Sequence, residues 1–181
     1  LAGYYVGLIG YTSGATIKNL KLEDVDITGD RNVGGLIGRA FDTEVLNCHS
    51  SGTVQGSYEG QPGNDGGTGG LIGNVLGGSV ENSDTEGTVA GTDVVGGLIG
   101  FNRARIENCH SDAAVGTDGS TRDYVGGLIG SNGYRDYYAN DHTVKESHST
   151  GKVQGSSRVG GLIGYNSSTS LLSDCHSAST V

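Results

Sequence analysis

The sequence has little positive charge and no long apolar run. Its 11 Lys and Arg residues stand against 20 Asp and Glu, which gives a formal net charge of −9. Without a basic stripe, the chain lacks the electrostatic footprint of a nucleic-acid-binding protein, and binding to an anionic membrane surface is disfavoured for the same reason. The apolar runs extend over a few residues, far fewer than a membrane-spanning helix needs. We therefore expect no nucleic-acid partner and no membrane insertion in this segment.

Proline is nearly absent, and methionine and tryptophan are missing. Pro62 is the single proline, whereas glycine is the largest class with 35 of 181 residues. Glycine at this density without a strict three-residue period excludes a collagen-like structure. Regularly placed Val, Leu and Ile argue against disorder because they supply a core. The glycines then indicate tight corners or close approaches of the backbone.

A glycine-rich motif, Val95-Gly96-Gly97-Leu98-Ile99-Gly100, recurs along the chain. The Leu residues of successive copies are 28, 35, 27, 30 and 34 positions apart. A period near thirty is typical of an array in which each unit stacks on its neighbours. The other copies are Val33–Gly38, Val125–Gly130 and Val159–Gly164, with Thr68–Gly73 a close variant and Tyr5–Gly10 a looser one.

Each repeat offers three short segments in which polar and apolar residues alternate, and no window has apolar residues at helical spacing for three turns. This pattern favours strands. We predict an all-β fold, a parallel β-solenoid (β-helix) of about six three-strand coils, with residues 1–181 forming a single array. The chain begins inside one repeat and stops on the last strand of another, so we expect a fragment of a longer array. The predicted coils are approximately 1–30, 31–65, 66–92, 93–122, 123–156 and 157–181.

A second motif follows each glycine-rich one, and in the second repeat it contains Val45, Asn47 and Cys48. The alternation slips by one position between Asn47 and Cys48, which predicts a corner. Stacked Asn side chains at this corner can hydrogen-bond to one another, so we predict an internal polar ladder, with a binding role as the alternative. The ladder comprises Asn19, Asn47, Asn82 and Asn108, with Glu146 and Asp174 in the last two coils.

The pairing of Gly-Leu-Ile-Gly-x-Asn at 97–102, 127–132 and 161–166 with Ile106-x-Asn108-Cys109-x-Ser111 resembles the GLUG motif. That repeat is found in large secreted and surface proteins of bacteria and archaea, including proposed adhesins and non-catalytic regions of some immunoglobulin A-cleaving metallopeptidases. The resemblance covers essentially the whole chain and implies a β-solenoid module at the cell surface or outside the cell. It implies no activity. Coil one departs from the motif at Val6, and coils two and three depart at Ala40 and Val75.

The cysteines share one repeat position in coils two, four and six. Two coils separate Cys48 from Cys109 and Cys109 from Cys175, or about 10 Å, which is beyond the reach of a disulfide. We predict three buried free thiols. The chain contains no His-Glu-x-x-His motif and no nucleophile with a nearby base in sequence, so we expect neither a cofactor nor an enzyme activity.

His110, His148 and His176 occupy the next, outward position on consecutive coils, which allows their rings to stack about 5 Å apart. We interpret them as a solvated column. The alternatives are adventitious binding of Zn²⁺ or Ni²⁺ and protonation near pH 6.

The glycine-rich strand poses a question of orientation, because strict alternation places Leu on one face and Val and Ile on the other. Either a glycine bulge turns both sets inward, or one aliphatic ladder stays outside and forms an assembly stripe covered by a partner or a neighbouring rod. The stripe comprises Leu36, Ile37, Leu98, Ile99, Leu128, Ile129, Leu162 and Ile163.

Two segments, Gly56–Gly67 and Gly133–His142, exceed the length of the shortest repeats. The second contains Tyr134, Arg135, Tyr137 and Tyr138, a composition that suits a sugar or protein surface. Asn166-Ser167-Ser168 is a glycosylation sequon.

We expect a structural module of an extracellular or cell-surface protein, acting as a stalk, a spacer or a self-assembling filament or sheath element. Its partners would be further copies or neighbouring repeats of the same protein. The alternative is an adhesin that binds glycan or host protein through the inserted loops. A polysaccharide-active β-helix enzyme is a third hypothesis, but the scattered Lys, Arg and acidic positions do not indicate one.

Overall fold

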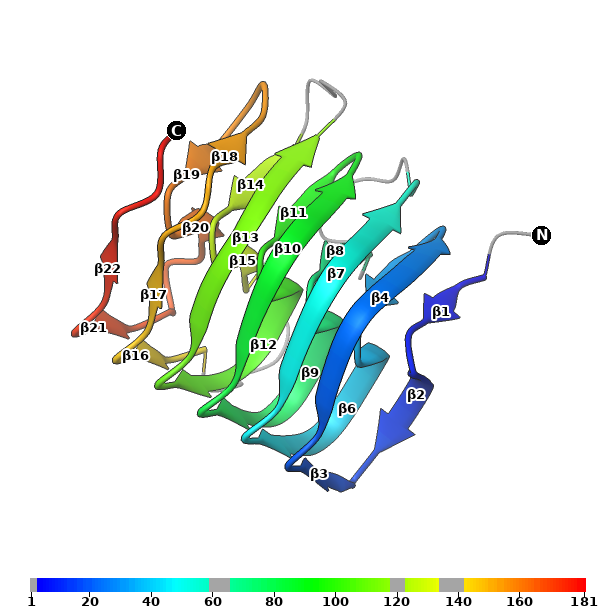
Figure 1. Ribbon diagram of the computed structural model, residues 1–181. Coiled ribbons are helices and arrows are strands. Elements are labelled where there is room, and N and C mark those ends of the chain that lie inside the picture. Colours follow the sequence, from blue (N-terminus) through cyan, green and yellow to red (C-terminus); the bar gives the residue numbers. More distant parts are fainter. Residues whose placement is uncertain (1–2, 59–65, 118–122, 134–141) are drawn as a thin grey trace.

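The computed structural model describes residues 3–58, 66–117, 123–133 and 142–181. Within these residues the chain forms no helix, and its parallel strands are arranged in three sheets that we name A, B and C (Figure 1). The chain visits A, B and C in turn in each coil, so the predicted parallel β-solenoid is confirmed.

The strands of the three sheets are as follows. Sheet A contains β1 (Tyr5–Val6), β5 (Asn32–Gly34), β8 (Gly67–Gly69), β11 (Val94–Gly96), β14 (Tyr124–Gly126) and β19 (Val159–Gly160). Sheet B contains β2 (Ile9–Ser13), β3 (Thr16–Lys18), β6 (Ile37–Leu46), β9 (Ile72–Glu81), β12 (Ile99–Glu107), β15 (Ile129–Asn132), β16 (Val144–Lys145), β20 (Ile163–Asn166) and β21 (Leu172–Ser173). Sheet C contains β4 (Lys21–Gly29), β7 (His49–Gly56), β10 (Asp84–Gly91), β13 (His110–Thr117), β17 (His148–Ser149), β18 (Val153–Gln154) and β22 (His176–Ser177).

Equivalent positions of the repeat lie beside one another in adjacent coils. In sheet A, Val95 pairs with Thr68 on one side and with Val125 on the other. In sheet C, Asp84 pairs in the same way with His49 and His110. Each repeat position therefore forms a column that runs along the stack, from the N-terminal coil to the C-terminal coil (Figure 1).

The glycine-rich motif forms the corner between sheets A and B. β5 ends at Gly34, the chain bends through Gly35 and Leu36, and β6 begins at Ile37. The bend directs both Leu36 and Ile37 into the interior, where each is 0% exposed. The glycines thus turn both sets of aliphatic side chains inward, although by a bend between two sheets and not by a bulge within one strand.

The alternative of an exterior assembly stripe is therefore wrong, and the burial supports the alternative in which both sets point inward. Strict alternation applies only within one strand, and the bend at Gly35 interrupts it before an aliphatic ladder can emerge on the outside. Leu162 and Ile163, in the last coil, are partly buried and pack against the same core. The other stripe residues, Leu36, Ile37, Leu98, Ile99, Leu128 and Ile129, are all fully buried.

The core consists of columns of aliphatic side chains. The main cluster combines the Leu-Ile pair of the glycine-rich motif with residues on both sides of the next corner, such as Val45 and Cys48. A second cluster joins sheets A and C through Val89, Val95 and Val125, among others. Burial of these columns between neighbouring coils supplies the main favourable free energy of folding.

Glycine also sets how closely the corner approaches sheet C. A Cβ atom at Gly97 would overlap the hydroxyl oxygen of Ser111 and the carbonyl oxygen of Gly127. Hydroxyl groups of sheet C also bond to the glycine corner of the following coil. Thr85 Oγ1 donates a hydrogen bond of 2.9 Å to Gly97 O, and Ser149 Oγ donates one of 2.6 Å to Gly161 O. The inward column of small hydroxyl residues in sheet C is therefore matched to the glycine column.

We expect Gly97→Ala to lower the free energy of unfolding by about 1–3 kcal/mol, the usual effect of overpacking a close contact. Gly116→Ala is the matched control, because its Cβ would meet nothing closer than Gln154 O at 3.9 Å and its φ is ordinary for an L-residue. That control should leave stability unchanged or slightly raised. Urea denaturation monitored by circular dichroism gives the free energy of unfolding of both variants. Equal urea midpoints for the two would contradict the inference that the hydroxyl column of sheet C is matched to the glycine column.

Candidate functional surfaces

A ladder of asparagine side chains runs across strands β12, β15 and β20 of sheet B, and its first two members lie inside the stack. Asn102 and Asn132 are both fully buried. Asn102 Nδ2 donates to Asn132 Oδ1 (2.7 Å), and Asn132 Nδ2 donates to Asn166 Oδ1 (2.9 Å). Asn102 Oδ1 also accepts from the backbone N–H of Ala104 (3.1 Å), so the ladder closes the turn that follows. The sequence carried the signal, as the recurrent Asn of Gly-Leu-Ile-Gly-x-Asn, but its role was not predicted.

The asparagine ladder predicted at the corner between sheets B and C lies on the outside of the stack. Its four members have the left-handed φ values expected at a corner, 59°, 53°, 49° and 50° in chain order, and all four are exposed. Asn47 Nδ2 donates to Asn19 Oδ1 (3.1 Å), and Asn108 Nδ2 donates to Asn82 Oδ1 (2.6 Å). The prediction of an internal ladder is wrong because each Asn occupies the apex of the corner, while the flanking Val45 and Cys48 fill the interior.

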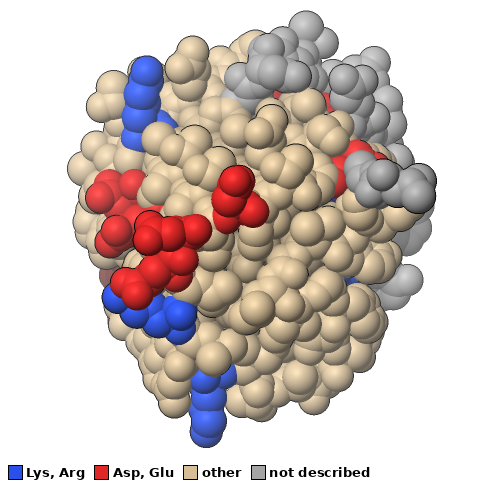
Figure 2. Space-filling model, turned by 45° about the vertical axis from the view of Figure 1, so that its right-hand side comes forward, with Lys and Arg blue, Asp and Glu red and all other residues tan. Residues whose placement is uncertain are grey.

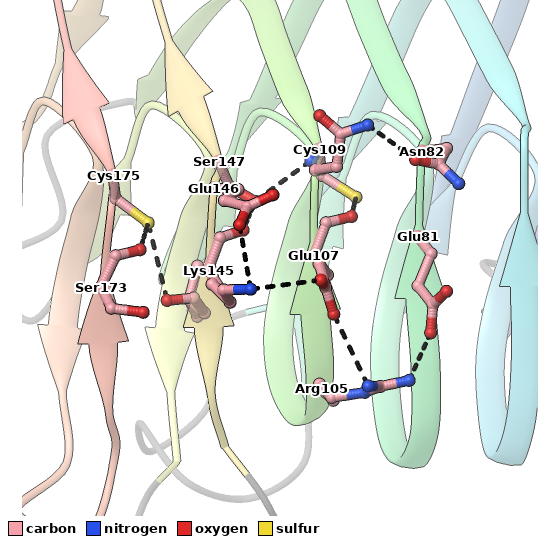
Figure 3. A network of polar contacts seen from close by, with 12 residues as sticks. Glu81, Asn82, Arg105, Glu107, Cys109, Lys145, Glu146, Ser147, Ser173 and Cys175 are labelled. Atoms are coloured by element: carbon pink, nitrogen blue, oxygen red, sulfur yellow. Dashed lines mark hydrogen bonds and ion pairs between the residues drawn. The ribbon is translucent and has the colours of Figure 1, made fainter.

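Charged side chains join three coils beside this corner (Figure 3). Arg105 Nη2 lies 2.5 Å from Glu81 Oε1, and Arg105 Nη1 lies 3.5 Å from Glu107 Oε2. Lys145 Nζ lies 2.9 Å from Glu146 Oε1 and 3.6 Å from Glu107 Oε1. The hydrogen bond and charge of Glu146, with a smaller effect of Glu107, raise the pKa of Lys145. These pairs are partly exposed to solvent, so we attribute only a modest stabilisation to them.

The three cysteines are free, as the coil spacing predicted. Cys48 and Cys109 are buried, whereas Cys175 in the last coil is half-buried. Burial raises the pKa of Cys109 to about 12 and also raises that of Cys48.

Serine alternates with cysteine along this column. The backbone N–H of Cys109 donates to Ser147 Oγ (3.1 Å), and that hydroxyl donates to Lys145 O (2.7 Å). Cys109 Sγ likewise donates to Glu107 O (3.3 Å). In both coils the acceptor is the carbonyl two residues before the donating side chain. The thiols and hydroxyls thus donate hydrogen bonds to equivalent corner carbonyls in successive coils, which gives the cysteines a structural role.

The histidine column has the predicted stacked arrangement. The rings of His110 and His148 have centroids 4.1 Å apart, and those of His148 and His176 are 4.7 Å apart with nearly parallel planes at 7°. In the same column, His49 Nδ1 lies 2.6 Å from Asp84 Oδ2. Burial, and secondarily the charges of His110 and His176, lower the pKa of His148.

Stacking does not support the metal-binding alternative for this column. Ring nitrogens coordinate a metal in the plane of the ring, so parallel rings direct their nitrogens along parallel lines and not to a common point. Among the described residues, no group of three or more His, Cys, Asp or Glu side chains is arranged to hold a metal ion.

The tyrosine-rich loop predicted as a binding site lies outside the described residues. This applies to Tyr134, Arg135, Tyr137 and Tyr138, and to most of the segment Gly56–Gly67. Asn166 of the glycosylation sequon is described and exposed, and its Oδ1 accepts the hydrogen bond from Asn132.

Comparison with protein families matches the GLUG motif at residues 29–55 and 155–181. The chain carries GLUG repeats. Each matched segment runs from the end of one sheet C strand through sheets A and B to the end of the next sheet C segment, so one GLUG repeat corresponds to one coil. The strand register places the remaining coils in equivalent positions.

GLUG repeats are typical of secreted and surface proteins. A search of curated proteins finds no match to the chain. Within the described residues, no helix long and apolar enough to span a membrane is present.

Removal of an interior Asn should cost far more stability than removal of an exterior one. Asn132→Ala removes the buried hydrogen bonds that Asn132 accepts from Asn102 Nδ2 and donates to His142 O, and we expect a loss of about 1–3 kcal/mol. Asn108→Gly removes one exposed hydrogen bond but suits the left-handed backbone, so we expect a change within about 0.5 kcal/mol. Urea denaturation distinguishes the two, and a larger loss for Asn108→Gly would contradict the interior ladder.

The lowered pKa of His148 predicts that acid weakens the stack. The unfolded chain binds this proton more readily, so the contribution of His148 is fully present above its ordinary pKa of 6.5 and is lost as the pH falls toward the lower folded value. His148→Gln should therefore reduce the fall in thermal midpoint between about pH 7 and pH 5. His49→Gln, in the same column but beside Asp84, is the control that keeps the stack. If the thermal midpoint of His148→Gln depended on pH as strongly as that of the wild type, the predicted contribution of His148 would be wrong.

Proposed function

We propose that this chain is a stiff structural module of an extracellular or cell-surface protein, which acts as a spacer or stalk and not as an enzyme. The supporting observation is the register: the strands of all three sheets pair coil by coil along the same stack. Hydrogen bonds between neighbouring strands therefore run along the axis of the stack, together with the interior Asn ladder. Each coil adds about 4.8 Å to the length of the stack, so the span is set by the number of repeats.

The GLUG matches support the surface location, and the ladders support the structural role. The Asn and Cys-Ser columns connect one coil to the next through buried hydrogen bonds. Such columns keep the distance between neighbouring coils constant, and a spacer requires a constant length.

A distance measurement between the outer coils tests this proposal. Spin labels at Glu23→Cys and Ala178→Cys lie at exposed positions, in strand β4 of coil one and just after strand β22 of coil six. Cys175→Ser removes the half-buried thiol, and Ser already occupies the same column at Ser83 and Ser147. Pulsed electron–electron double resonance should give one narrow distribution of the distance between the two labels. We expect it at about 24 Å, for five coil intervals of about 4.8 Å. A broad distribution would show a flexible array and reject the spacer.

The sequence of the segment Gly133–His142 favours a second function, adhesion to a glycan or a protein. Its three tyrosines and one arginine provide ring faces and a cation for such a ligand. Replacement of Tyr134–Tyr138 by Gly and Ser should abolish binding on glycan or host-protein arrays if this function is correct, and wild-type protein without any binding would exclude it. New unsaturated ends on acidic polysaccharides incubated with the protein would instead establish an enzyme.

A further inference from the structure

The sequence contains one Asn-Gly dipeptide, Asn132-Gly133, where strand β15 ends. Asparagine followed by glycine is the pair most prone to deamidate, because glycine has no side chain to hinder attack of its backbone nitrogen on the preceding amide. The other members of the same ladder, Asn102 and Asn166, are followed by Arg and Ser. The reactive pair therefore occurs in coil five and not at the equivalent positions of its neighbours.

The fold requires glycine at this position. Gly133 has a φ of +73°, a conformation that residues with a side chain rarely adopt. A Cβ atom there would lie 2.7 Å from His142 Nδ1 and 2.8 Å from Ser167 Cβ. A larger residue would therefore strain the backbone and overlap its neighbours, so the structure retains a chemically reactive pair next to its interior ladder.

Deamidation of this pair proceeds without an enzyme or a redox partner. The backbone nitrogen of Gly133 loses its proton and attacks Asn132 Cγ, so that a nitrogen–carbon bond forms. The bond between Cγ and Nδ2 breaks, and ammonia leaves. Water then opens the resulting succinimide ring at one of its two carbonyl groups and gives aspartate or isoaspartate. Water is consumed and ammonia is released, which balances the reaction.

The folded stack opposes the first step through the hydrogen bonds of the two reacting groups. Gly133 N–H donates to Asn102 O (2.8 Å), so the proton that must leave is held by a carbonyl oxygen. Asn132 Oδ1 accepts from Asn102 Nδ2 (2.7 Å), and Asn132 Nδ2 donates to Asn166 Oδ1 (2.9 Å) and His142 O (3.0 Å). Attack makes Cγ tetrahedral and displaces both amide atoms, which breaks these bonds in a fully buried site.

The peptide groups around the pair are held as well. Asn132 O accepts hydrogen bonds from Ser167 N (2.9 Å) and Ser170 Oγ (3.2 Å). Gly133 O accepts one from Ser131 Oγ (3.1 Å). Closure of the succinimide ring requires the peptide group between the two residues to turn, so it requires these contacts to open first.

From these contacts we infer that Asn132-Gly133 is a latent deamidation site, which the folded stack protects and which local opening of coil five exposes. Strand β15 pairs with β12 and with β20 at three positions each, whereas β6 and β9 pair at eight. A segment with fewer paired positions opens at a lower free-energy cost. This inference goes beyond the proposed function and does not depend on the spacer role.

Deamidation would prevent coil five from closing again. Exposed carboxylates are readily accommodated, since Figure 2 shows Asp and Glu side chains grouped on the surface beside Lys or Arg side chains. An ionised aspartate at position 132 would instead be buried, and it could not donate to Asn166 Oδ1 or His142 O. Isoaspartate would also lengthen the main chain and disturb the register of β15. Each long-lived opening would thus leave a permanent chemical change.

Peptide mapping by mass spectrometry tests the inference on the wild-type chain. The protein is incubated in mildly alkaline buffer with and without urea, and the fractions of asparagine, aspartate and isoaspartate at position 132 are followed over time. We expect deamidation to be at least about tenfold faster in urea, because only opened molecules react in native buffer. Equal rates in the two conditions would show that the fold gives no protection and would overturn the inference.

A pair of variants tests whether the interior ladder provides the protection. Asn102→Ala removes the donor to Asn132 Oδ1 but keeps the Asn-Gly pair and the backbone acceptor of Gly133 N–H. It should deamidate about two- to tenfold faster than the wild type in native buffer, the effect of one lost hydrogen bond, and equally fast in urea. Asn108→Gly, which removes a bond of the exterior ladder, is the control and should leave both rates unchanged. Circular dichroism verifies that both variants are folded, and an unchanged native rate in folded Asn102→Ala would reject the role of the ladder.

The consequence of deamidation is tested with an imitation of its product. Asn132→Asp should lower the urea midpoint clearly, because it places a carboxylate in the buried ladder. Asn108→Asp is the matched control at the exterior corner, where coil six already has Asp174 with the same left-handed backbone. Its urea midpoint should change little. Equal midpoints for the two variants would contradict the claim that deamidation keeps coil five open.

Discussion

In-register stacking of parallel coils is the constraint on which the rest of this structure depends. Adjacent strands lie about 4.8 Å apart, so every side chain must be compatible with the residues at its own position in the coils above and below. Gly97 shows how strict this requirement is, since its close neighbours are Ser111 of sheet C and Gly127 of the next coil. A substitution therefore acts first along its column, and only then on its neighbours in sequence.

The same constraint explains why two kinds of asparagine recur. Asn102 and Asn132 are buried, where an amide must find both a donor and an acceptor, and the stacked amides supply them to one another. Asn47 is exposed to water, so hydrogen bonding alone does not demand an amide there. Its left-handed backbone does favour Asn, because a short polar side chain tolerates that conformation better than most residues.

Much of the fold could be predicted from the sequence, because the columns are visible as repeats. The phase slip between Asn47 and Cys48 located a corner, and alternation placed Val45 and Cys48 inside. The sequence could not show that Gly35 lies between two sheets and not within one strand, so alternation across it left an exterior aliphatic stripe as an alternative, and that stripe does not exist. It also could not show on which side of a corner an apex residue points, since that depends on how the two sheets meet.

The Leu-Ile ladders of the core are not accessible from the sides of the stack. The glycine bend removes the Leu-Ile ladders from the sides, so lateral bundling through those ladders has no surface to use.

Cohesion between coils is unevenly distributed along the axis. In the middle of the stack, β10 and β13 pair over eight residues, whereas β17 and β22 pair over two. The exterior corner also changes there, from Asn108 to Glu146 and then Asp174, which cannot donate the amide hydrogen bond of the ladder when ionised. The stacked rings of His110, His148 and His176 connect these coils. Aromatic stacking thus adds contact between coils where the strand pairing is shortest.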